Sequence, residues 1–240
     1  AAHAERFGQR AEAHRFGRED QIAEQSARDP RQPFHFEMVA HAVDEMRAHG
    51  AAVVGASLLT GSLYSAESCQ ALVQTALDGL GGLDILVNAA DYRGDKPFEQ
   101  VTPEDWDKAL DGSFTASLFC TQYALPALQA SKGNIVNITS SYGQMGGPDG
   151  SSAYAAASAS IVNMTRMQAL RFGAEGVRSN CLCAGPIEGS TAAEATELPP
   201  IGRYGTAQDM VGSILFMASE HASFMTGAII VNDGGRYSGA

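Results

Sequence analysis

Lysine is scarce in this sequence: only Lys96, Lys108 and Lys132 occur, and residues 133–240 contain none. No apolar run approaches the roughly 18 residues that a membrane-spanning helix requires. The four cysteines form no Cys-x-x-Cys pair, and the six histidines show no metal-ligand spacing. A basic excess is also missing, because 16 Lys and Arg stand against 27 Asp and Glu, a formal net charge of −11. We therefore expect no metal site, no nucleic-acid partner and no membrane span.

What is present suits a compact protein. The chain has 240 residues, of which 45% are hydrophobic and 18% are charged, enough apolar material for one core. We expect Cys69, Cys120, Cys181 and Cys183 to be reduced thiols in or near this core. The first twenty residues have no apolar block, so we expect no secretory signal there. These features together predict a cytoplasmic location.

Charge and hydropathy divide the chain into two parts. Residues 1–34 hold six Arg and six acidic residues with few large apolar side chains, and no buried strand is evident among them. Residues 35–240 contribute the whole net negative charge and alternate helical patterns with short apolar runs. We therefore predict a polar N-terminal segment, 1–34, that replaces or precedes a first strand, and one folded domain, 35–240.

The folded part alternates strands with helices. We predict helices at 36–49, 66–77, 102–130, 152–172 and 206–219, and strands at 51–59, 83–88, 134–139, 177–183 and 228–231. Thr102 followed by Pro103 and two acids is typical of a helix start, with a cap, a proline at the first position and acids in the first turn. Alternation of this kind indicates an α/β fold, a doubly wound parallel sheet covered by helices on both faces.

Several segments carry a resemblance to a known family. The segments 85–90 and 134–143, Tyr154, and the ending Thr226-Gly227-Ala228-Ile229-Ile230-Val231-Asn232-Asp233-Gly234-Gly235 stand in one order and spacing. From about residue 36 to residue 236 the chain resembles the short-chain dehydrogenase/reductase family. The resemblance implies a Rossmann-like doubly wound sheet, NAD(P) as cofactor, and oxidation of an alcohol or reduction of a carbonyl.

The cofactor-binding part of that family pattern is degenerate here. The family opens with a strand and a Gly-x-x-x-Gly-x-Gly turn that lets the backbone approach a pyrophosphate, but no such triplet precedes Gly50. Ser57, Leu58 and Leu59 stand where the family places an adenine-binding aspartate. Its Asn-Asn-Ala-Gly reads Asn88-Ala89-Ala90-Asp91. We therefore expect a degenerate N-terminal nucleotide-binding unit, no cofactor-binding residues, and no cofactor bound by this chain.

The catalytic pattern is also incomplete. The family uses Asn, Ser, Tyr and a Lys four residues after the Tyr; Tyr154 matches the tyrosine, but Ser158 replaces the lysine. Ser113 holds the asparagine position. Ser140 matches the serine, with Ser141 as second choice because the count to Tyr154 is one residue longer than usual. Ser140 and Tyr154 are thus the candidate site residues, read as inactive remnants whose hydroxyls satisfy local backbone groups, or as groups that still bind a substrate carbonyl.

The missing lysine has a calculable chemical cost. A phenol with a pKa of about 10 is roughly 0.1% ionised at pH 7, and the family's ammonium group favours the phenolate. Losing a positive neighbour that lowers a phenol pKa by two to three units forfeits roughly 3 to 4 kcal/mol, or a factor of several hundred in active base. A serine at this position can donate a hydrogen bond but brings no charge.

Three functional hypotheses follow. The first is a catalytically inactive subunit that supports an active, homologous NAD-dependent alcohol or hydroxyacyl-CoA dehydrogenase, with NAD in the partner, in a heterotetramer. Two-subunit dehydrogenases of this kind, such as the hydroxy(phenyl)methyl-succinyl-CoA type, include a non-catalytic short-chain subunit, and the ending Gly234-Gly235-Arg236 is similar to that group. The second is an active lyase or epimerase that uses Ser140 and Tyr154 without nicotinamide. The third is an oxidoreductase whose first strand lies outside this sequence.

Overall fold

A four-stranded parallel sheet forms the centre of the computed structural model, which describes residues 35–48, 65–92, 96–146, 152–188 and 197–237. The strands are β1 (Ile85–Asn88), β2 (Asn134–Ser140), β3 (Arg178–Ala184) and β4 (Ile229–Asn232), paired in the order β1-β2-β3-β4. Each strand pairs in parallel with its neighbour, so the four carboxyl ends lie at one edge of the sheet. The predicted α/β fold class is confirmed by this arrangement and by the comparisons described below.

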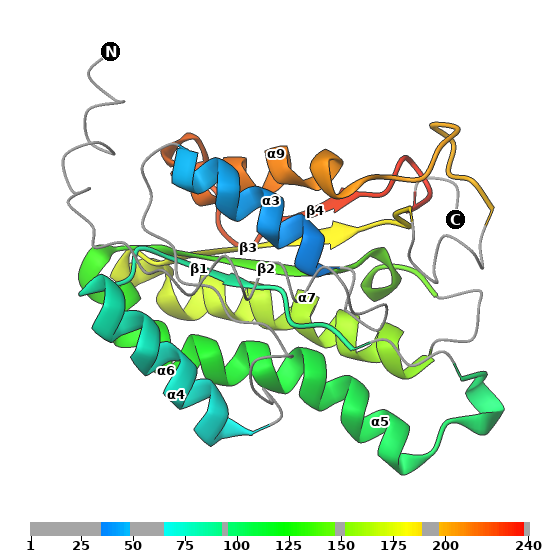
Figure 1. Ribbon diagram of the computed structural model, residues 1–240, viewed down its shortest axis with the longest axis horizontal. Coiled ribbons are helices and arrows are strands. Elements are labelled where there is room, and N and C mark those ends of the chain that lie inside the picture. The colour runs from blue at the N-terminus through cyan, green and yellow to red at the C-terminus, as the bar shows by residue number, and fades with distance from the viewer. Residues whose placement is uncertain (1–34, 49–64, 93–95, 147–151, 189–196, 238–240) are drawn as a thin grey trace.

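Helices cover both faces of this sheet (Figure 1). On one face lie α4 (Ala66–Leu80), α6 (Ala116–Ser131) and α7 (Ser152–Phe172). On the other face lie α9 (Ala207–Ala218) and α3 (His35–Ala48), which packs against α9. The predicted helices agree with these bounds to within a few residues. The predicted strand 51–59 and the polar segment 1–34 lie outside the described residues.

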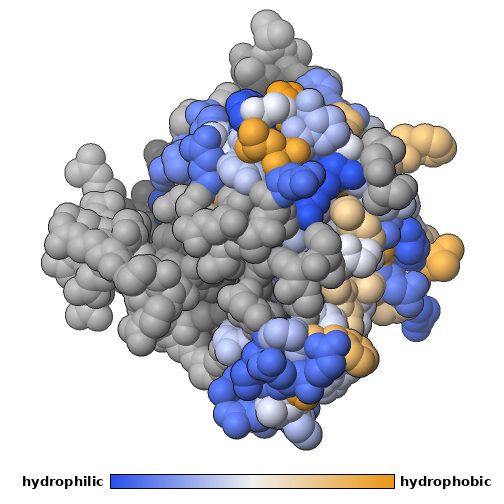
Figure 2. Space-filling view, turned by 90° about the vertical axis from the view of Figure 1, so that its right-hand side faces the viewer, coloured by the Kyte–Doolittle hydropathy of each residue, from blue (hydrophilic) through white to orange (hydrophobic). Residues whose placement is uncertain are grey.

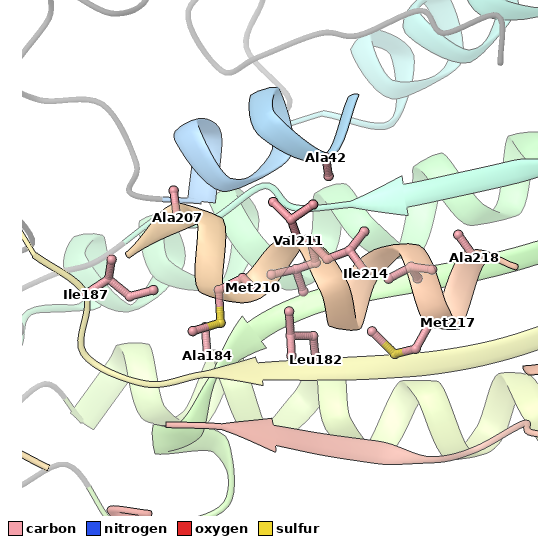
Figure 3. Packing of buried hydrophobic residues seen from close by; sticks show 12 residues of the cluster. Ala42, Leu182, Ala184, Ile187, Ala207, Met210, Val211, Ile214, Met217 and Ala218 are labelled. Atoms are coloured by element: carbon pink, nitrogen blue, oxygen red, sulfur yellow. The ribbon is translucent and has the colours of Figure 1, made fainter. Parts of the chain in front are cut away.

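Alternating side chains on the strands separate the two layers of core. On β3, Cys181 and Cys183 face α7, while Leu182 and Ala184 face α9. Figure 3 shows α9 lying between α3 and the sheet, with its buried side chains directed at the strands. β2 and β3 are therefore buried on both faces along nearly their whole length, as expected for strands of a parallel sheet covered by helices. All four cysteines are buried and none forms a disulfide, in agreement with the sequence expectation.

A buried polar network crosses the middle of the sheet. Asn88 on β1 donates to Asn137 Oδ1 on β2 at 2.9 Å, and Asn137 Nδ2 donates to Thr165 and Gln168 of α7, both at 2.9 Å. Ser179 on β3 donates in turn to Gln168 Oε1 at 2.8 Å. These side chains are buried, so each bond replaces one that water supplied in the unfolded chain. The network ties three strands to α7 and fixes their register.

The longest helical segment is interrupted by a π-helical turn. Thr102 and Asp105 form a capping box at the start of α5 (Pro103–Ala109), as the sequence predicted. The turn η2 (Leu110–Thr115) has π-helical hydrogen bonding and joins α5 to α6. An extra residue in a turn of this type shifts the faces of the helices on either side of it. Pro126 lies inside α6, which continues past it to Ser131.

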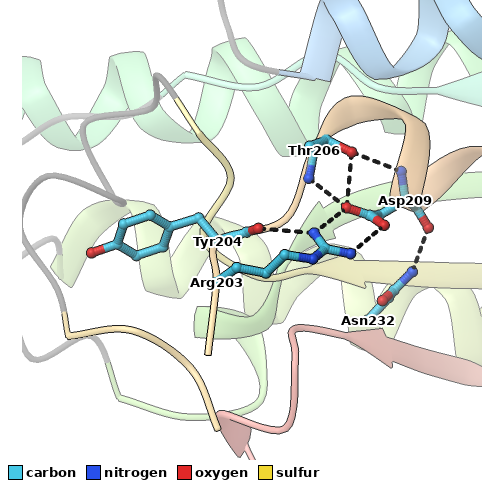
Figure 4. A network of polar contacts seen from close by, with 5 residues as sticks. All are labelled: Arg203, Tyr204, Thr206, Asp209 and Asn232. Carbon is cyan, nitrogen blue, oxygen red and sulfur yellow. Dashed lines mark hydrogen bonds and ion pairs between the residues drawn. The ribbon is translucent and has the colours of Figure 1, made fainter. Parts of the chain in front are cut away.

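A second capping box fixes the start of α9 near the carboxyl edge of the sheet (Figure 4). Asp209 accepts hydrogen bonds from the Thr206 backbone and hydroxyl and forms an ion pair with Arg203, at 2.7 Å from Nη1. Arg203 and the Thr206 backbone hold the pKa of Asp209 well below its usual range. Asn232 of β4 donates to the Asp209 carbonyl oxygen at 3.0 Å. These bonds join the end of β4 to the first turn of α9.

Candidate functional site

The candidate residues gather at the carboxyl edge of the sheet. Asp91 follows the end of β1, and Ser140 is the last residue of β2, where it leads into the short helix η3 (Ser141–Gly143). Tyr154 and Ser158 lie in the first two turns of α7, which contacts η3. This edge lies at the right of Figure 1 and faces the viewer in Figure 2, where the coloured surface is largely hydrophilic with a few hydrophobic spots.

Ser140 is buried and holds a local backbone turn. Its hydroxyl oxygen accepts a hydrogen bond from the Tyr142 backbone N–H at 3.2 Å and so caps the start of η3. Only 8% of Ser140 is exposed. In the structure, the Ser140 hydroxyl is thus the acceptor for a backbone N–H two residues further along the chain. The same turn presents the ring of Tyr142 to α7.

Tyr154 forms a hydrogen bond with a side chain, whereas the interpretation as an inactive remnant expected a bond to local backbone groups. Its hydroxyl donates to Asp91 Oδ2 at 2.9 Å, and both side chains are more than nine-tenths buried. The ring of Tyr142 meets that of Tyr154 edge-on, with centroids 6.3 Å apart. In this contact the phenol oxygen donates its proton into the hydrogen bond and the carboxylate oxygen accepts it. Tyr154 is therefore arranged as a hydrogen-bond donor.

Ser158 is enclosed at the position where the family has its lysine. It is 1% exposed, and its hydroxyl oxygen has no hydrogen-bond partner among the described residues. Gly143 packs directly on the backbone here: a Cβ added to it would lie 2.8 Å from the Ser158 carbonyl carbon. The close contact of η3 with α7 keeps Tyr142 against Tyr154. It also leaves Ser158 facing packed protein.

The lysines of the chain are occupied elsewhere. Lys96 and Lys108 pair with Asp105 and Glu104 around the start of α5, at 2.7 and 2.6 Å. Lys132 caps the end of α6 with a left-handed backbone conformation. None of the three lies in α7, the helix in which the family has its lysine.

Ser113, which stands in the family's asparagine position, supports the loop that carries Asp91. It lies in the π-helical turn η2, is 1% exposed, and accepts a hydrogen bond from the Tyr92 backbone N–H at 3.0 Å. The residue next to Asp91 is thereby tied to the helix layer. Ser113 thus has a positioning role toward Asp91, one that its sequence position alone did not reveal.

Two residues at the carboxyl edge, Asp91 and Arg236, were not among the site residues predicted from the sequence. Asp91 was noted only as a departure from a glycine, and its position just after β1 was the available signal for a role at the strand ends. Arg236, which follows β4, lies with its guanidinium carbon 5.5 Å from the centroid of the Tyr142 ring. Its Nη1 is buried and has no hydrogen-bond partner among the described residues.

The chemistry available here is hydrogen bonding and charge recognition. The described residues include no group of three His, Cys, Asp or Glu side chains able to hold a metal ion. No helix in the described part of the chain is long and apolar enough to cross a membrane. Asp91, Tyr154 and Arg236 supply one carboxylate, one phenol donor and one guanidinium at a single edge of the sheet.

Comparison with known proteins places this arrangement in a family. The profile of the family described as enoyl-(acyl carrier protein) reductase matches residues 34–236. An uncharacterized oxidoreductase of Schizosaccharomyces pombe is 31% identical over 210 residues, covering 82% of this chain and 79% of the relative. The subunit BbsD of (2S)-[(R)-hydroxy(phenyl)methyl]succinyl-CoA dehydrogenase from Thauera aromatica is 31% identical over 224 residues, covering 90% of this chain and 88% of BbsD.

Solved structures agree with these matches. A Sinorhizobium meliloti protein described as a short-chain alcohol dehydrogenase has a TM-score of 0.71 at 28% identity, with 82% of each chain covered. The protein ElxO, solved with NADP bound, has a TM-score of 0.68 at 26% identity, covering 73% of this chain and 76% of ElxO. The parallel sheet, its covering helices and these similarities together mean that the chain belongs to the short-chain dehydrogenase/reductase family of oxidoreductases.

Proposed function

We propose that this chain is a non-catalytic subunit that supports an active, homologous NAD-dependent alcohol or hydroxyacyl-CoA dehydrogenase in a cytoplasmic hetero-oligomer, most simply a heterotetramer. The observation that carries the proposal is the hydrogen bond from the Tyr154 hydroxyl to Asp91. The family's proton transfer uses a tyrosine beside a lysine, whereas this tyrosine donates to a carboxylate and Ser158 stands in place of the lysine. In this proposal Ser140 and Tyr154 stabilise the fold and take no part in catalysis.

The residues at this edge do not fit a nicotinamide dinucleotide. The buried carboxylate of Asp91 lies where the family sequence has glycine, and it adds negative charge beside the phenol that would meet the cofactor. Asp91 and Ser158 together replace a neutral backbone position and a cation by an anion and a neutral hydroxyl. A dinucleotide with an anionic pyrophosphate gains nothing from this change. We propose that the cofactor, NAD, is held by the partner subunit.

The long helix α7 offers a surface for that partner. Ala159 is exposed, while its neighbours Ala157 and Ser158 are buried in the chain's own fold. Small exposed residues allow another helix to approach closely. The subunit named BbsD, similar over most of its length, comes from a dehydrogenase described by its subunits, which supports a multi-subunit setting for relatives of this chain.

Two other functions compete with this one. The Tyr154–Asp91 pair is also what a lyase or epimerase without nicotinamide would need, a donor and a carboxylate in contact. An oxidoreductase whose first strand lies outside this sequence is the second alternative, since the N-terminal part falls outside the described residues. The experiments below separate all three.

Titration with NADH and NADPH distinguishes the proposed non-catalytic subunit from an oxidoreductase that binds its own cofactor. We expect no saturable binding by isothermal titration, either to residues 1–240 alone or to a protein that also carries any sequence preceding residue 1. A micromolar Kd, worth about −8 kcal/mol, would overturn the proposal and favour the oxidoreductase with its own cofactor.

Substitution in α7 tests the interface. We expect Ala159→Arg to dissociate the complex in native mass spectrometry and abolish the partner's dehydrogenase activity, while the isolated chain keeps its melting temperature. The matched control, Gln70→Arg on the exposed face of α4, leaves the complex intact. A full-size, fully active assembly with Ala159→Arg would place the interface elsewhere.

Substitution at the tyrosine tests catalysis. In the assembled complex we expect Tyr154→Phe to leave kcat nearly unchanged, because the hydroxyl is engaged with Asp91. A fall in kcat of about a hundredfold with the assembly intact would instead favour the lyase or epimerase hypothesis.

A further inference from the structure

A buried and unpaired nitrogen of Arg236 points to a ligand. Arg236 is partly exposed as a residue, yet its Nη1 is buried and has no hydrogen-bond partner among the described residues. The guanidinium carbon of Arg236 lies over the face of the Tyr142 ring, 5.5 Å from the ring centroid. An aromatic face attracts the cation but offers no hydrogen-bond acceptor in the guanidinium plane. A buried N–H donor without an acceptor costs free energy.

The turn that carries Arg236 is firmly built. Asp233 is 7% exposed; its Oδ1 accepts from the Gly235 N–H at 2.9 Å and its Oδ2 from the Tyr237 N–H at 2.7 Å. Both carboxylate oxygens are thus occupied by backbone groups on either side of Arg236. Gly234 and Gly235 have left-handed backbone, at φ of +68° and +91°. A Cβ on Gly234 would lie 2.8 Å from Ile201, so the turn fits closely against its neighbours.

The two buried aspartates at this edge of the sheet, Asp233 and Asp91, have other hydrogen-bond partners. Asp233 is committed to the turn, and Asp91 accepts the Tyr154 hydroxyl. No ion pair to Arg236 occurs in the described ranges. In a chain with a net charge of −11, a buried cationic donor left unpaired at the end of the sheet is unusual. An external acceptor would complete its hydrogen bonding.

We infer that Arg236 anchors a binding site for an oxyanion, the carboxylate or phosphoryl group of a small ligand, at the carboxyl edge of the sheet. A guanidinium presents N–H donors in a flat fork that matches the oxygens of such groups. The ring of Tyr142 contacts both the Arg236 guanidinium and the ring of Tyr154. The contact with the aromatic face helps to hold the guanidinium in place. The inference does not depend on the proposed function, since a subunit without hydride transfer can still hold a ligand.

Isothermal titration of the full chain tests the site with three probes. These are 3-hydroxybutyrate, its uncharged methyl ester, and inorganic phosphate, all at constant ionic strength. We expect 3-hydroxybutyrate or phosphate to bind saturably with a Kd on the order of 1 mM, and the ester not to bind. Binding of 3-hydroxybutyrate alone identifies the oxyanion as a carboxylate, and binding of phosphate alone identifies it as a phosphoryl group.

Three variants assign the binding to Arg236. Arg236→Gln should weaken the affinity by about tenfold or more, and Arg236→Lys, which keeps the charge but loses the fork, should weaken it less. The control Arg171→Gln, an exposed arginine near the far end of α7, should bind as the original chain does. Near-ultraviolet circular dichroism verifies that Tyr142 and Tyr154 keep their packing, and Arg236→Lys carries the test if Arg236→Gln does not fold. Absence of saturable binding, equal binding of the ester, or binding unchanged in the folded Arg236 variant would overturn the inference.

Discussion

The middle of the sheet and its carboxyl edge treat buried polar groups in opposite ways. In the middle, Asn137 is fully buried and both ends of its amide are hydrogen-bonded, within a network that spans three strands. Four buried side-chain atoms lack a partner among the described residues, and three of them, on Thr139, Ser158 and Arg236, lie at or next to the carboxyl edge. The fourth, Asn134 Oδ1, lies at the opposite end of β2.

This difference separates folding from ligand chemistry. A satisfied buried network stabilises one register and one arrangement of helices, because every alternative leaves amides unpaired. Unpaired groups persist where the surrounding structure holds them in place, and such places are frequently functional. We therefore interpret the middle of the sheet as the part that stabilises the fold. The carboxyl edge is the region where the sequence differs from the family pattern. Four experiments can break or sharpen that contrast.

The largest effect is expected in the middle of the sheet. Asn137→Leu removes the buried hydrogen bonds that Asn137 makes with Asn88, Thr165 and Gln168. One N–H of the Asn88 amide then has no acceptor, although its bond to Thr121 remains. We expect a loss of about 3 kcal/mol or more in the free energy of unfolding, measured by urea denaturation. Asn163→Leu, at an exposed position of α7, serves as control and should change stability by less than about 0.5 kcal/mol. A similar loss in both variants would contradict the scaffold role of the network.

The second effect tests the packing that shapes the edge. Gly143→Ala places a methyl group 2.8 Å from the backbone of Ser158, and neither main chain can move cheaply. We expect a loss of about 2 kcal/mol and a weaker near-ultraviolet signal from Tyr142 and Tyr154. Gly146→Ala, which has no atom within 4 Å of the added group, should be close to neutral. Equal stabilities for the two variants would mean that η3 is free to shift.

The third effect isolates the hydrogen bond at the site. A double-mutant cycle with Tyr154→Phe and Asp91→Ala should give a coupling energy of about 1.5 kcal/mol, typical of a hydrogen bond to a charged group. Urea denaturation of the four proteins supplies the numbers. Additive single effects, with a coupling below about 0.3 kcal/mol, would show that Tyr154 and Asp91 do not interact in solution.

The smallest effect has the opposite sign. Ser158→Ala removes a buried hydroxyl that lacks a partner, so we expect the protein to become more stable by up to about 1 kcal/mol. Ser160→Ala removes a hydroxyl that donates to the Ala156 carbonyl at 2.9 Å, and it should not stabilise. Destabilisation by Ser158→Ala in thermal denaturation would mean that this hydroxyl has a partner in solution.

Local patterns predicted most of the fold because its elements carry local signals. The bounds of α7 match the predicted 152–172, and both capping boxes stand where Thr102 and Thr206 predicted helix starts. The strand predicted from Leu83 begins only at Ile85, the first residue that pairs in register with β2, opposite Asn134. Pairing between strands decided that boundary, and an apolar run cannot reveal it.

The site was less predictable because it depends on distant contacts. Tyr154 and Ser140 were found by their order and spacing in the sequence, and this says where they stand but not what they contact. The partner of Tyr154 lies 63 residues earlier in the chain, and Arg236 reaches Tyr142 from beyond the last strand. Only the parallel order of the strands brings these residues to one edge. A single sequence does not encode such pairings in any local period.

The π-helical turn between α5 and α6 has a consequence for how the protein can change. Successive residues of a helix are separated by about 100° around its axis. One extra residue in a turn therefore rotates the side chains that follow it relative to those that precede it. Because of this turn, α5 contacts α7 while α6 packs against α4. The continuous helical segment therefore packs against two different helices. Deleting Gly112 would restore a regular helix and swing Ser113 out of alignment with Tyr92. The loop that carries Asp91 would then lose its hydrogen bond to Ser113. Deletion of one residue in this turn would thus change the position of Asp91 at the carboxyl edge of the sheet.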